Sequence, residues 1–262
     1  MKLATKDKNT LKNSYMLLWG LILSIVLVLF FIIKNNDKKL PFITVLITSY
    51  NYGEYLPETL NSVLSQTYKN YEIVVIDDGS EDNSVEIIKG YAEKHKNIKL
   101  FTHKDGKNNG LVASLILGIS KSKGEFVAFL ESDDYWHKDN LLEKIKILEK
   151  HPKAKIIGNR VEPFGDAARV KMQKPYLKSI DDKIYSINYF REYQANPIPT
   201  MSSVMIQRNV LNNLDFNVDS EVNIDFHLYK QVFVFHPLYY INKTLTYWRQ
   251  HNRSFSYIES FK

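Results

Sequence analysis

The sequence predicts an α/β protein with a largely parallel sheet flanked by helices. Between Phe42 and Ile157, short apolar runs alternate regularly with helical patterns, which is typical of βαβ units. Two of the apolar runs also lead directly into acid clusters, Asp77-Asp78-Gly79-Ser80 and Glu131-Ser132-Asp133-Asp134. Ligands of open α/β sheets bind at the carboxyl ends of the strands, so these clusters mark the predicted site.

The strands are predicted from apolar, β-branched runs bounded by turn residues. These runs are Phe42–Thr48, Glu72–Ile76, Ile98–Phe101, Glu125–Leu130, Lys155–Ile157, Met201–Ile206 and Tyr239–Tyr247. Helices are predicted where apolar residues recur every three or four positions. The predicted helices are Tyr55–Gln66, one capped by Asp82 or Asn83, Leu111–Ser122, Lys138–Lys150, Ile187–Tyr193 and Ile224–Val234.

The composition excludes several classes of function. The 262 residues suffice for one substantial domain with appendages, and the net charge of +6 comes from lysines spread widely along the chain. No arginine-rich tract or nucleic-acid motif is present, so we expect no nucleic-acid partner. With no cysteine in the chain, disulfides and thiolate metal sites are excluded.

The N-terminal region contains an uncharged apolar run, Tyr15–Ile33. This run is long enough for one membrane-spanning helix, and too long for the apolar core of a cleavable signal peptide, which is the alternative. Lysines on both sides leave the orientation open. The predicted layout is a tail (1–14), an anchor (15–33), a linker (34–40) and a domain (41–262) with two halves, 41–158 and 159–262.

The clustered acids predict a cation site. Carboxylates that lie close together raise one another's pKa, so such clusters are typical of places where a divalent cation and a phosphate bind. Oxygen ligands favour Mg²⁺ or Mn²⁺. The alternative is a purely structural role, in which Asp133 and Asp134 cap the turn that follows them.

Three segments together resemble the inverting family 2 glycosyltransferases of the GT-A fold. They are Thr44–Asn51, Tyr55–Asp82 and Phe129–Trp136, and the resemblance extends from Phe42 to about Ser256. The order and separation of these segments make the match far more specific than any one of them alone. The resemblance implies a nucleotide-sugar-binding fold of the Rossmann-like kind and a sugar-transferring enzyme.

The resemblance also implies roles for individual residues. Asp133 is the expected metal ligand, and His251 a third ligand or a structural histidine. Asp225 is the expected catalytic base, with an N-cap role as its alternative and Glu221 and Asp219 as fallbacks. The expected nucleotide-sugar-binding residues are Ser49, Asp77, Asp78, Asn108, Glu131, Ser132 and Asp133.

Other side chains receive weaker expectations. Arg249 or Arg253 is expected to grip a diphosphate, and Tyr135 and Trp136 to stack on an acceptor sugar or to pack in the core. The chain departs from the family pattern at Glu131, where aspartate is usual. It departs again at Leu115 and Ile116, where many relatives carry arginine and asparagine.

The predicted function is a membrane-anchored, single-pass transferase with its catalytic domain in the cytoplasm. It would move one sugar from a UDP- or GDP-sugar to a glycan or a lipid-linked saccharide of the cell envelope, with Mn²⁺ or Mg²⁺ as cofactor. Two alternatives remain open. A nucleotidyltransferase would need a Gly-rich basic loop, which Ser49–Gly53 is not. A scaffold protein that has lost turnover would account for the departures from the family pattern.

Overall fold

The computed structural model describes residues 15–16, 18–28, 40–177, 184–185, 198–218 and 224–254. The chain divides into two compact units, Met1–Leu40 and Pro41–Lys262. The predicted helix Ile187–Tyr193 lies outside the described residues, as do the fallback bases Glu221 and Asp219.

The prediction of a membrane anchor at Tyr15–Ile33 is wrong. Among the described residues, no helix is both long enough and apolar enough to cross a bilayer. The prediction of a single-pass membrane location is corrected with it.

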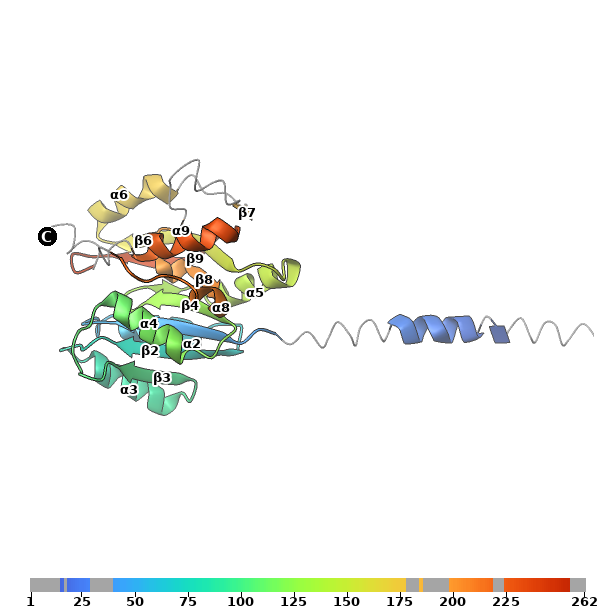
Figure 1. Ribbon diagram of the computed structural model, residues 1–262, viewed down its shortest axis with the longest axis horizontal. Coiled ribbons are helices and arrows are strands. Elements are labelled where there is room, and N and C mark those ends of the chain that lie inside the picture. Colours follow the sequence, from blue (N-terminus) through green and yellow to red (C-terminus); the bar gives the residue numbers. More distant parts are fainter. Residues whose placement is uncertain are drawn as a thin grey trace, which may run out of the picture. The chain divides into compact units, whose positions relative to one another are not determined.

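The larger unit is built on one sheet with the strand order β3-β2-β1-β4-β8-β6-β9-β5 (Figure 1). Its first four strands are parallel, as predicted. They are β3 (Ile98–Thr102), β2 (Tyr71–Asp77), β1 (Ile43–Ser49) and β4 (Phe126–Glu131).

The second half of the sheet is mixed, which the sequence did not predict. β8 (Val204–Gln207) runs antiparallel to both of its neighbours, β4 and β6 (Ile156–Gly165). The long β9 (Leu238–Gln250) is parallel to β6 and antiparallel to the short strands β5 (Tyr135–Trp136) and β7 (Ile184–Tyr185). Arg160 and Glu162 in β6 are exposed while Val161 is buried, as side chains alternate along a strand. Because these two positions are charged, the apolar run that predicts a strand ends before them, and the predicted strand is shorter than β6.

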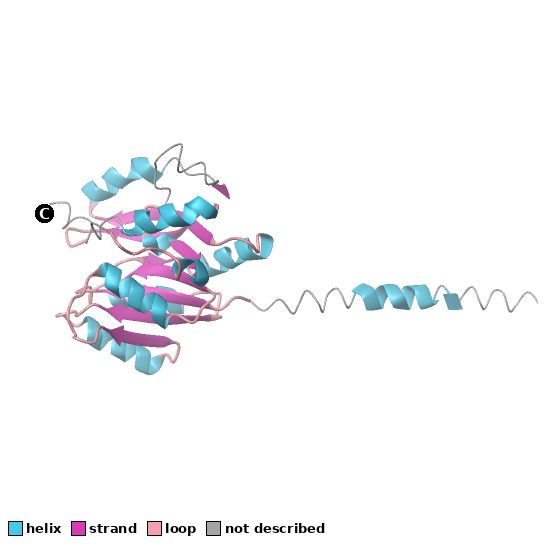
Figure 2. Cartoon of the chain, in the orientation of Figure 1, coloured by secondary structure: helices cyan, strands magenta, loops and turns pink. Residues whose placement is uncertain are grey.

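Helices cover both faces of the sheet (Figure 2). One core contains Val45 and Ile47 of β1 together with side chains of α2 (Leu56–Leu64), α3 (Ser84–Lys94) and α5 (Asn140–Lys150). The other contains Leu46 with side chains of α4 (Leu111–Lys121) and α9 (Ile224–Phe235). The central strands are buried on both faces and therefore read as continuous apolar runs.

Three further short elements complete the described fold. They are α6 (Ala167–Leu177), the 3₁₀ turn η1 (Met201–Ser203) and α8 (Arg208–Leu211). The sequence pattern predicted none of them. The sequence pattern predicts a strand over Met201–Ile206, but the strand begins at Val204 and Met201–Ser203 form the 3₁₀ turn.

The strand register gathers the predicted site residues at one edge of the sheet. Ser49, the last residue of β1, lies opposite Asp77, the last residue of β2. On the other side of β1, Thr48 lies opposite Glu131 at the end of β4. Three segments far apart in the sequence therefore present polar side chains at the same level.

Candidate active site

The segment that follows β4 forms a tight acid cluster, which we call the acid loop (residues 131–134). Oxygens of Glu131, Asp133 and Asp134 lie within 4.8 Å of one another. Asp134 is fully buried and Asp133 is 7% exposed. Burial and then the charge of Asp133 raise the pKa of Glu131 to about 8, and the same two causes raise the pKa of Asp134 well above its usual value.

This donor set fits a hard divalent cation. Three carboxyl groups this close together cannot all ionise at low free-energy cost unless a positive charge lies among them. Carboxylate oxygens are also the ligands that Mn²⁺ and Mg²⁺ take in proteins. Asp134 belongs to the cluster, as its place among the clustered acids of the sequence predicted, although Asp133 alone was named as the metal ligand. The signal was present in the paired Asp133 and Asp134, but it did not separate a turn cap from a ligand.

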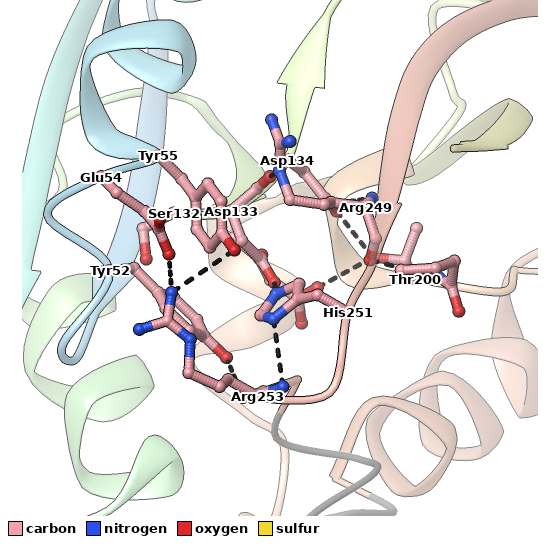
Figure 3. Close-up of polar contacts among 12 residues, drawn as sticks. Tyr52, Glu54, Tyr55, Ser132, Asp133, Asp134, Thr200, Arg249, His251 and Arg253 are labelled. Atoms are coloured by element: carbon pink, nitrogen blue, oxygen red, sulfur yellow. Dashed lines mark hydrogen bonds and ion pairs between the residues drawn. The ribbon is translucent and has the colours of Figure 1, made fainter. Parts of the chain in front are cut away.

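His251 lies against the acid loop, in the segment after β9 (Figure 3). Its Nε2 is 3.0 Å from Oδ2 of Asp133. The imidazole ring packs against Tyr52 and Tyr55, with centroid distances of 5.4 and 5.0 Å. Two residues predicted as metal ligands are thus brought together across 118 positions of sequence, while their role in binding a metal stays a prediction.

Asp134 is tied to two distant segments. Its Oδ1 accepts a hydrogen bond of 2.8 Å from the backbone N–H of Arg249. The hydroxyl of Thr200 is 3.5 Å from Oδ2 of Asp134 and donates to Oε2 of Glu131 at 3.1 Å. These bonds fix the orientation of both carboxylates, and no motif in the sequence pointed to Thr200.

The side chain of Arg249 holds the acid loop. Its Nε donates to the carbonyl oxygen of Asp133 at 2.7 Å, and its Nη2 forms an ion pair with Glu58. The guanidinium carbon lies 4.5 Å from the ring centroids of both Tyr55 and Phe164. These partners support the acid loop, while the expected contact of Arg249 with a diphosphate stays a prediction.

Arg253 is held by the segment between β1 and α2. Its Nη2 pairs with Glu54 and lies 3.4 Å from the hydroxyl of Tyr55. The hydroxyl of Tyr52 in turn donates to the carbonyl oxygen of Arg253 at 2.8 Å. These contacts fasten the end of the described chain beside the acid loop, as Figure 3 shows.

Replacing Arg249 with lysine should loosen the acid loop. Lysine keeps the positive charge but lacks the planar fork that reaches Asp133 and Glu58 together and stacks between two rings. We expect Mn²⁺ affinity to fall about 10-fold, as for other residues that orient metal ligands, and the melting temperature to fall by about 2–4 °C. Arg160→Lys, at an exposed position of β6, is the matched control. Equal Mn²⁺ affinity in the two variants, measured by titration calorimetry, would contradict this role.

The predicted nucleotide-binding acids Asp77 and Asp78 lie together at the end of β2 and bind neighbouring turns. Asp77 accepts from the backbone N–H and the hydroxyl of Ser80 at 2.9 and 2.7 Å. Asp78 accepts from the backbone N–H groups of Asn109 and Gly110 at 2.8 and 3.0 Å, which begin α4. Both carboxylates therefore shape the turns at this edge, and any ligand contact must use their remaining lone pairs.

Asn108 is exposed in the loop that packs on Gly79. A Cβ added at Gly79, which has φ +76°, would lie 2.6 Å from the carbonyl carbon of Lys107, so only glycine permits this approach. The side chain of Asn108 accepts from the N–H of Gly110 at 3.1 Å. Ser49 and Ser132, by contrast, are buried, and neither hydroxyl has a hydrogen-bond partner among the described residues.

Asp225 lies in the first turn of α9, and its Oδ1 accepts from the N–H of Phe226 at 2.6 Å. Burial raises the pKa of Asp225 to about 6. Its charge is the smallest of the causes that raise the pKa of Glu131. Ile224, directly before it, is buried in the core.

The aromatic pair after the acid loop is divided between core and surface. Trp136 is 3% exposed and donates from Nε1 to the carbonyl oxygen of Ser202 at 2.6 Å, so it belongs to the core. Tyr135 is half-buried and stacks on Tyr247 with a centroid distance of 4.5 Å. Only Tyr135 retains the expected position for contact with an acceptor.

Without a cation, thermal stability should fall as the pH rises from about 5 to 8. The carboxyl group of Glu131 has a pKa of 4.5 in the unfolded chain and about 8 in the folded one. The folded state binds the extra proton, so this stabilisation is complete below pH 4.5 and lost above pH 8. Asp134 and Asp225 contribute with the same sign. The lowered pKa of buried Lys144 contributes with the opposite sign.

The measurement is the melting temperature from pH 5 to 9 in EDTA. Glu131→Gln removes the titrating carboxyl and should flatten the fall, which separates its contribution from that of Lys144. Mn²⁺ should also flatten it, since a bound cation stabilises the ionised carboxylates. Identical slopes for the variant and the wild-type protein would count against the raised pKa.

With the fold and the acid loop described, comparison with known proteins identifies the class of protein. Residues 44–215 match the family described as "Glycosyl transferase family 2". The chain belongs to this family, which confirms the resemblance and the enzyme class, a glycosyltransferase.

Relatives and solved structures support the same conclusion. An uncharacterized glycosyltransferase of Haemophilus influenzae is 31% identical over 68% of this chain and 67% of its own length. One of Rickettsia conorii is 36% identical over 65% of this chain, a region that spans 26% of that relative.

Two solved structures share the fold, and in each the similar region covers 60% of the neighbour's own chain. S. aureus TarS 1-349 with UDP-GlcNAc has a TM-score of 0.63 at 18% identity over 81% of this chain. A Pyrobaculum calidifontis mannosyltransferase with GDP-Man and Mn²⁺ has a TM-score of 0.60 at 17% identity over 85% of this chain.

Proposed function

We propose that this protein transfers a single sugar from a nucleotide-diphospho-sugar to a hydroxyl group of an acceptor, with inversion at the anomeric carbon. The observation that carries the proposal is the acid loop, whose three carboxyl groups lie within 4.8 Å of one another. A further carboxyl group, that of Asp225, stands in the first turn of α9. Inverting transfer needs a base on one side of the sugar and stabilisation of the departing diphosphate on the other. The two groups of carboxylates match these two needs.

The leaving-group side would be formed by Asp133, with Glu131 and His251 beside it. These residues would hold Mn²⁺ or Mg²⁺, which when bound supplies positive charge to the diphosphate oxygens. Thr200 and Arg249 keep the carboxylates and the backbone of the acid loop in place. Ser49, Asp77, Asp78, Asn108 and Ser132 would contact the nucleotide part of the donor.

On the opposite side, Asp225 would remove the proton from the acceptor hydroxyl. The acceptor oxygen forms a bond to the anomeric carbon as the bond from that carbon to the diphosphate breaks. The bonding electrons leave with the nucleoside diphosphate, and the proton stays on Asp225. With a pKa of about 6, Asp225 is ionised and able to act as a base at neutral pH.

The donor class follows from the fold's known ligands. The two solved neighbours contain UDP-GlcNAc and GDP-Man respectively, and we propose a UDP- or GDP-sugar for this chain. The acceptor would be a glycan or another saccharide of the cell envelope. The first half of the larger unit (41–158) would bind the donor and the second half (159–262) the acceptor.

A thermal-shift screen tests this function directly. UDP, GDP, UDP-GlcNAc and GDP-Man are added with Mn²⁺ or with EDTA, and release of free nucleoside diphosphate is measured in parallel. A ligand at 100 times its dissociation constant stabilises the fold by about 2.7 kcal/mol, and the shift should require Mn²⁺. Stabilisation without release of nucleoside diphosphate from any donor would favour a scaffold protein over a transferase.

A further inference from the structure

The 3₁₀ turn η1 lies where strand pairing would otherwise continue beside the acid loop. β8 pairs antiparallel with β4, with Ala128 opposite Met205. Continuing that register would place Ser202 opposite Glu131, but β8 begins only at Val204 and Ser202 lies in the turn. At this level β8 therefore offers no backbone acceptor to β4. A backbone N–H that is kept from water and left without an acceptor costs free energy.

The side chain of Ser202 takes the place of the missing strand. Its hydroxyl accepts a hydrogen bond of 3.0 Å from the backbone N–H of Glu131. Ser202 is 0% exposed, so solvent does not compete for this bond. A hydrogen bond with the same side chain lowers the pKa of Asp134, against the stronger effects of burial and of the neighbouring charges. One hydroxyl thus acts on both ends of the acid loop.

The backbone of Ser202 fixes the turn that carries this hydroxyl. Its carbonyl oxygen accepts hydrogen bonds from Nε1 of Trp136 at 2.6 Å and from the hydroxyl of Thr246 at 3.2 Å. Its N–H donates to the hydroxyl oxygen of Thr200 at 3.1 Å, and that hydroxyl donates to Glu131. Every polar atom of Ser202 therefore has a partner. Through these bonds β5 and β9 hold the turn against the acid loop.

Ser203 lies in the same turn but is bonded differently. It is also 0% exposed, and its hydroxyl donates to the carbonyl oxygen of Thr200 at 2.9 Å. Within the described part of the chain, its side chain forms no hydrogen bond with the acid loop. The two neighbouring serines thus separate a role within the turn from a role toward the carboxylates.

We propose that Ser202 is a positioning residue, which holds Glu131 and Asp134 at the spacing that a divalent cation requires. This inference rests on the proposed function, in which the acid loop binds Mn²⁺ or Mg²⁺. Residues that orient metal ligands change the affinity for the metal without touching it. The turn acts as β-bulges do next to active sites, where they end strand pairing and re-aim a side chain.

The test compares Ser202→Ala with Ser203→Ala, since each variant removes one buried hydroxyl from the same turn. The affinity for Mn²⁺ is measured by calorimetry without nucleotide and again with UDP. The melting temperature in EDTA reports on the fold. Ser202→Cys is the second variant should Ser202→Ala not fold, because its sulfur fills the space but is a weak acceptor, and it carries the same expectation.

We expect Ser202→Ala to weaken Mn²⁺ binding about 10-fold, the lower end of the effect of residues that orient metal ligands. Ser203→Ala should leave Mn²⁺ affinity unchanged. Both variants should lower the melting temperature in EDTA by about 2–4 °C, because each loses one buried hydrogen bond. The two variants would then differ in metal affinity while matching in stability.

Equal Mn²⁺ affinity in Ser202→Ala and the wild-type protein would overturn the inference. An equal loss of affinity in Ser202→Ala and Ser203→Ala would also overturn it, because the effect would then belong to the turn as a whole. If the wild-type protein binds no Mn²⁺ with or without UDP, the proposed cation site fails and the inference fails with it. That failure is seen in the wild-type protein, whereas a failure of the inference alone is seen only between the variants.

Discussion

Asp225→Asn should lower turnover by about 10²- to 10⁴-fold while donor affinity stays unchanged. Asparagine cannot accept the proton that the acceptor hydroxyl must lose, and general-base catalysis contributes a factor of this size. The amide oxygen can still accept the hydrogen bond from Phe226, so α9 should begin as before. The measurement is release of nucleoside diphosphate under saturating donor, together with donor affinity by calorimetry.

The stability of this variant supplies the control. Burial raises the pKa of Asp225, which means that its ionised form is unfavourable in the fold near neutral pH. A neutral asparagine should therefore not lower the melting temperature at pH 7.5. Turnover equal to that of the wild-type protein would remove Asp225 from the mechanism. Loss of both turnover and stability would instead identify it as a residue that supports the start of α9.

Asp133→Asn should have the second large effect, a loss of turnover of at least about 10²-fold with loss of stabilisation by Mn²⁺. The carboxylate at this position is the one that adjoins both Glu131 and His251, and a neutral amide is a poor ligand for a hard cation. Without a cation, however, removal of its charge relieves the repulsion that raises the pKa values of Glu131 and Asp134. The metal-free variant should therefore melt at a higher temperature than the metal-free wild-type protein.

Opposite effects on activity and on metal-free stability distinguish this prediction from simple damage to the fold. Glu93→Gln removes one exposed negative charge on α3 and should change neither quantity. Thermal melts in EDTA and in Mn²⁺ measure both effects for each variant. If Mn²⁺ still stabilises Asp133→Asn as it does the wild-type protein, the acid loop is not the cation site.

The first half of the fold could be predicted because its signals are local. The strands β1, β2 and β4 are short apolar runs buried on both faces, and each ends at polar residues that belong to the same edge of the sheet. Parallel strands joined by helices bring such ends together without further information. The sequence alone therefore predicts that Ser49, Asp77 and Glu131 share one edge, as the strand register confirms.

The remaining features depend on contacts that no local pattern encodes. Arg249 reaches the acid loop across 115 positions of sequence, and Thr200 reaches Glu131 across 69. Whether Trp136 faces a ligand or the core depends on the carbonyl oxygen of Ser202, which follows a segment without periodicity.

The path of β9 has a consequence for protein synthesis. The ribosome releases the chain from its N-terminal end, and the β1–β4 sheet with its acid loop emerges about a hundred residues before Arg249 and His251. During that interval the carboxylates of Asp133 and Asp134 lack the partners that later orient them. A nascent chain should thus be folded in part yet unable to act on a sugar donor until its last strand has joined the sheet.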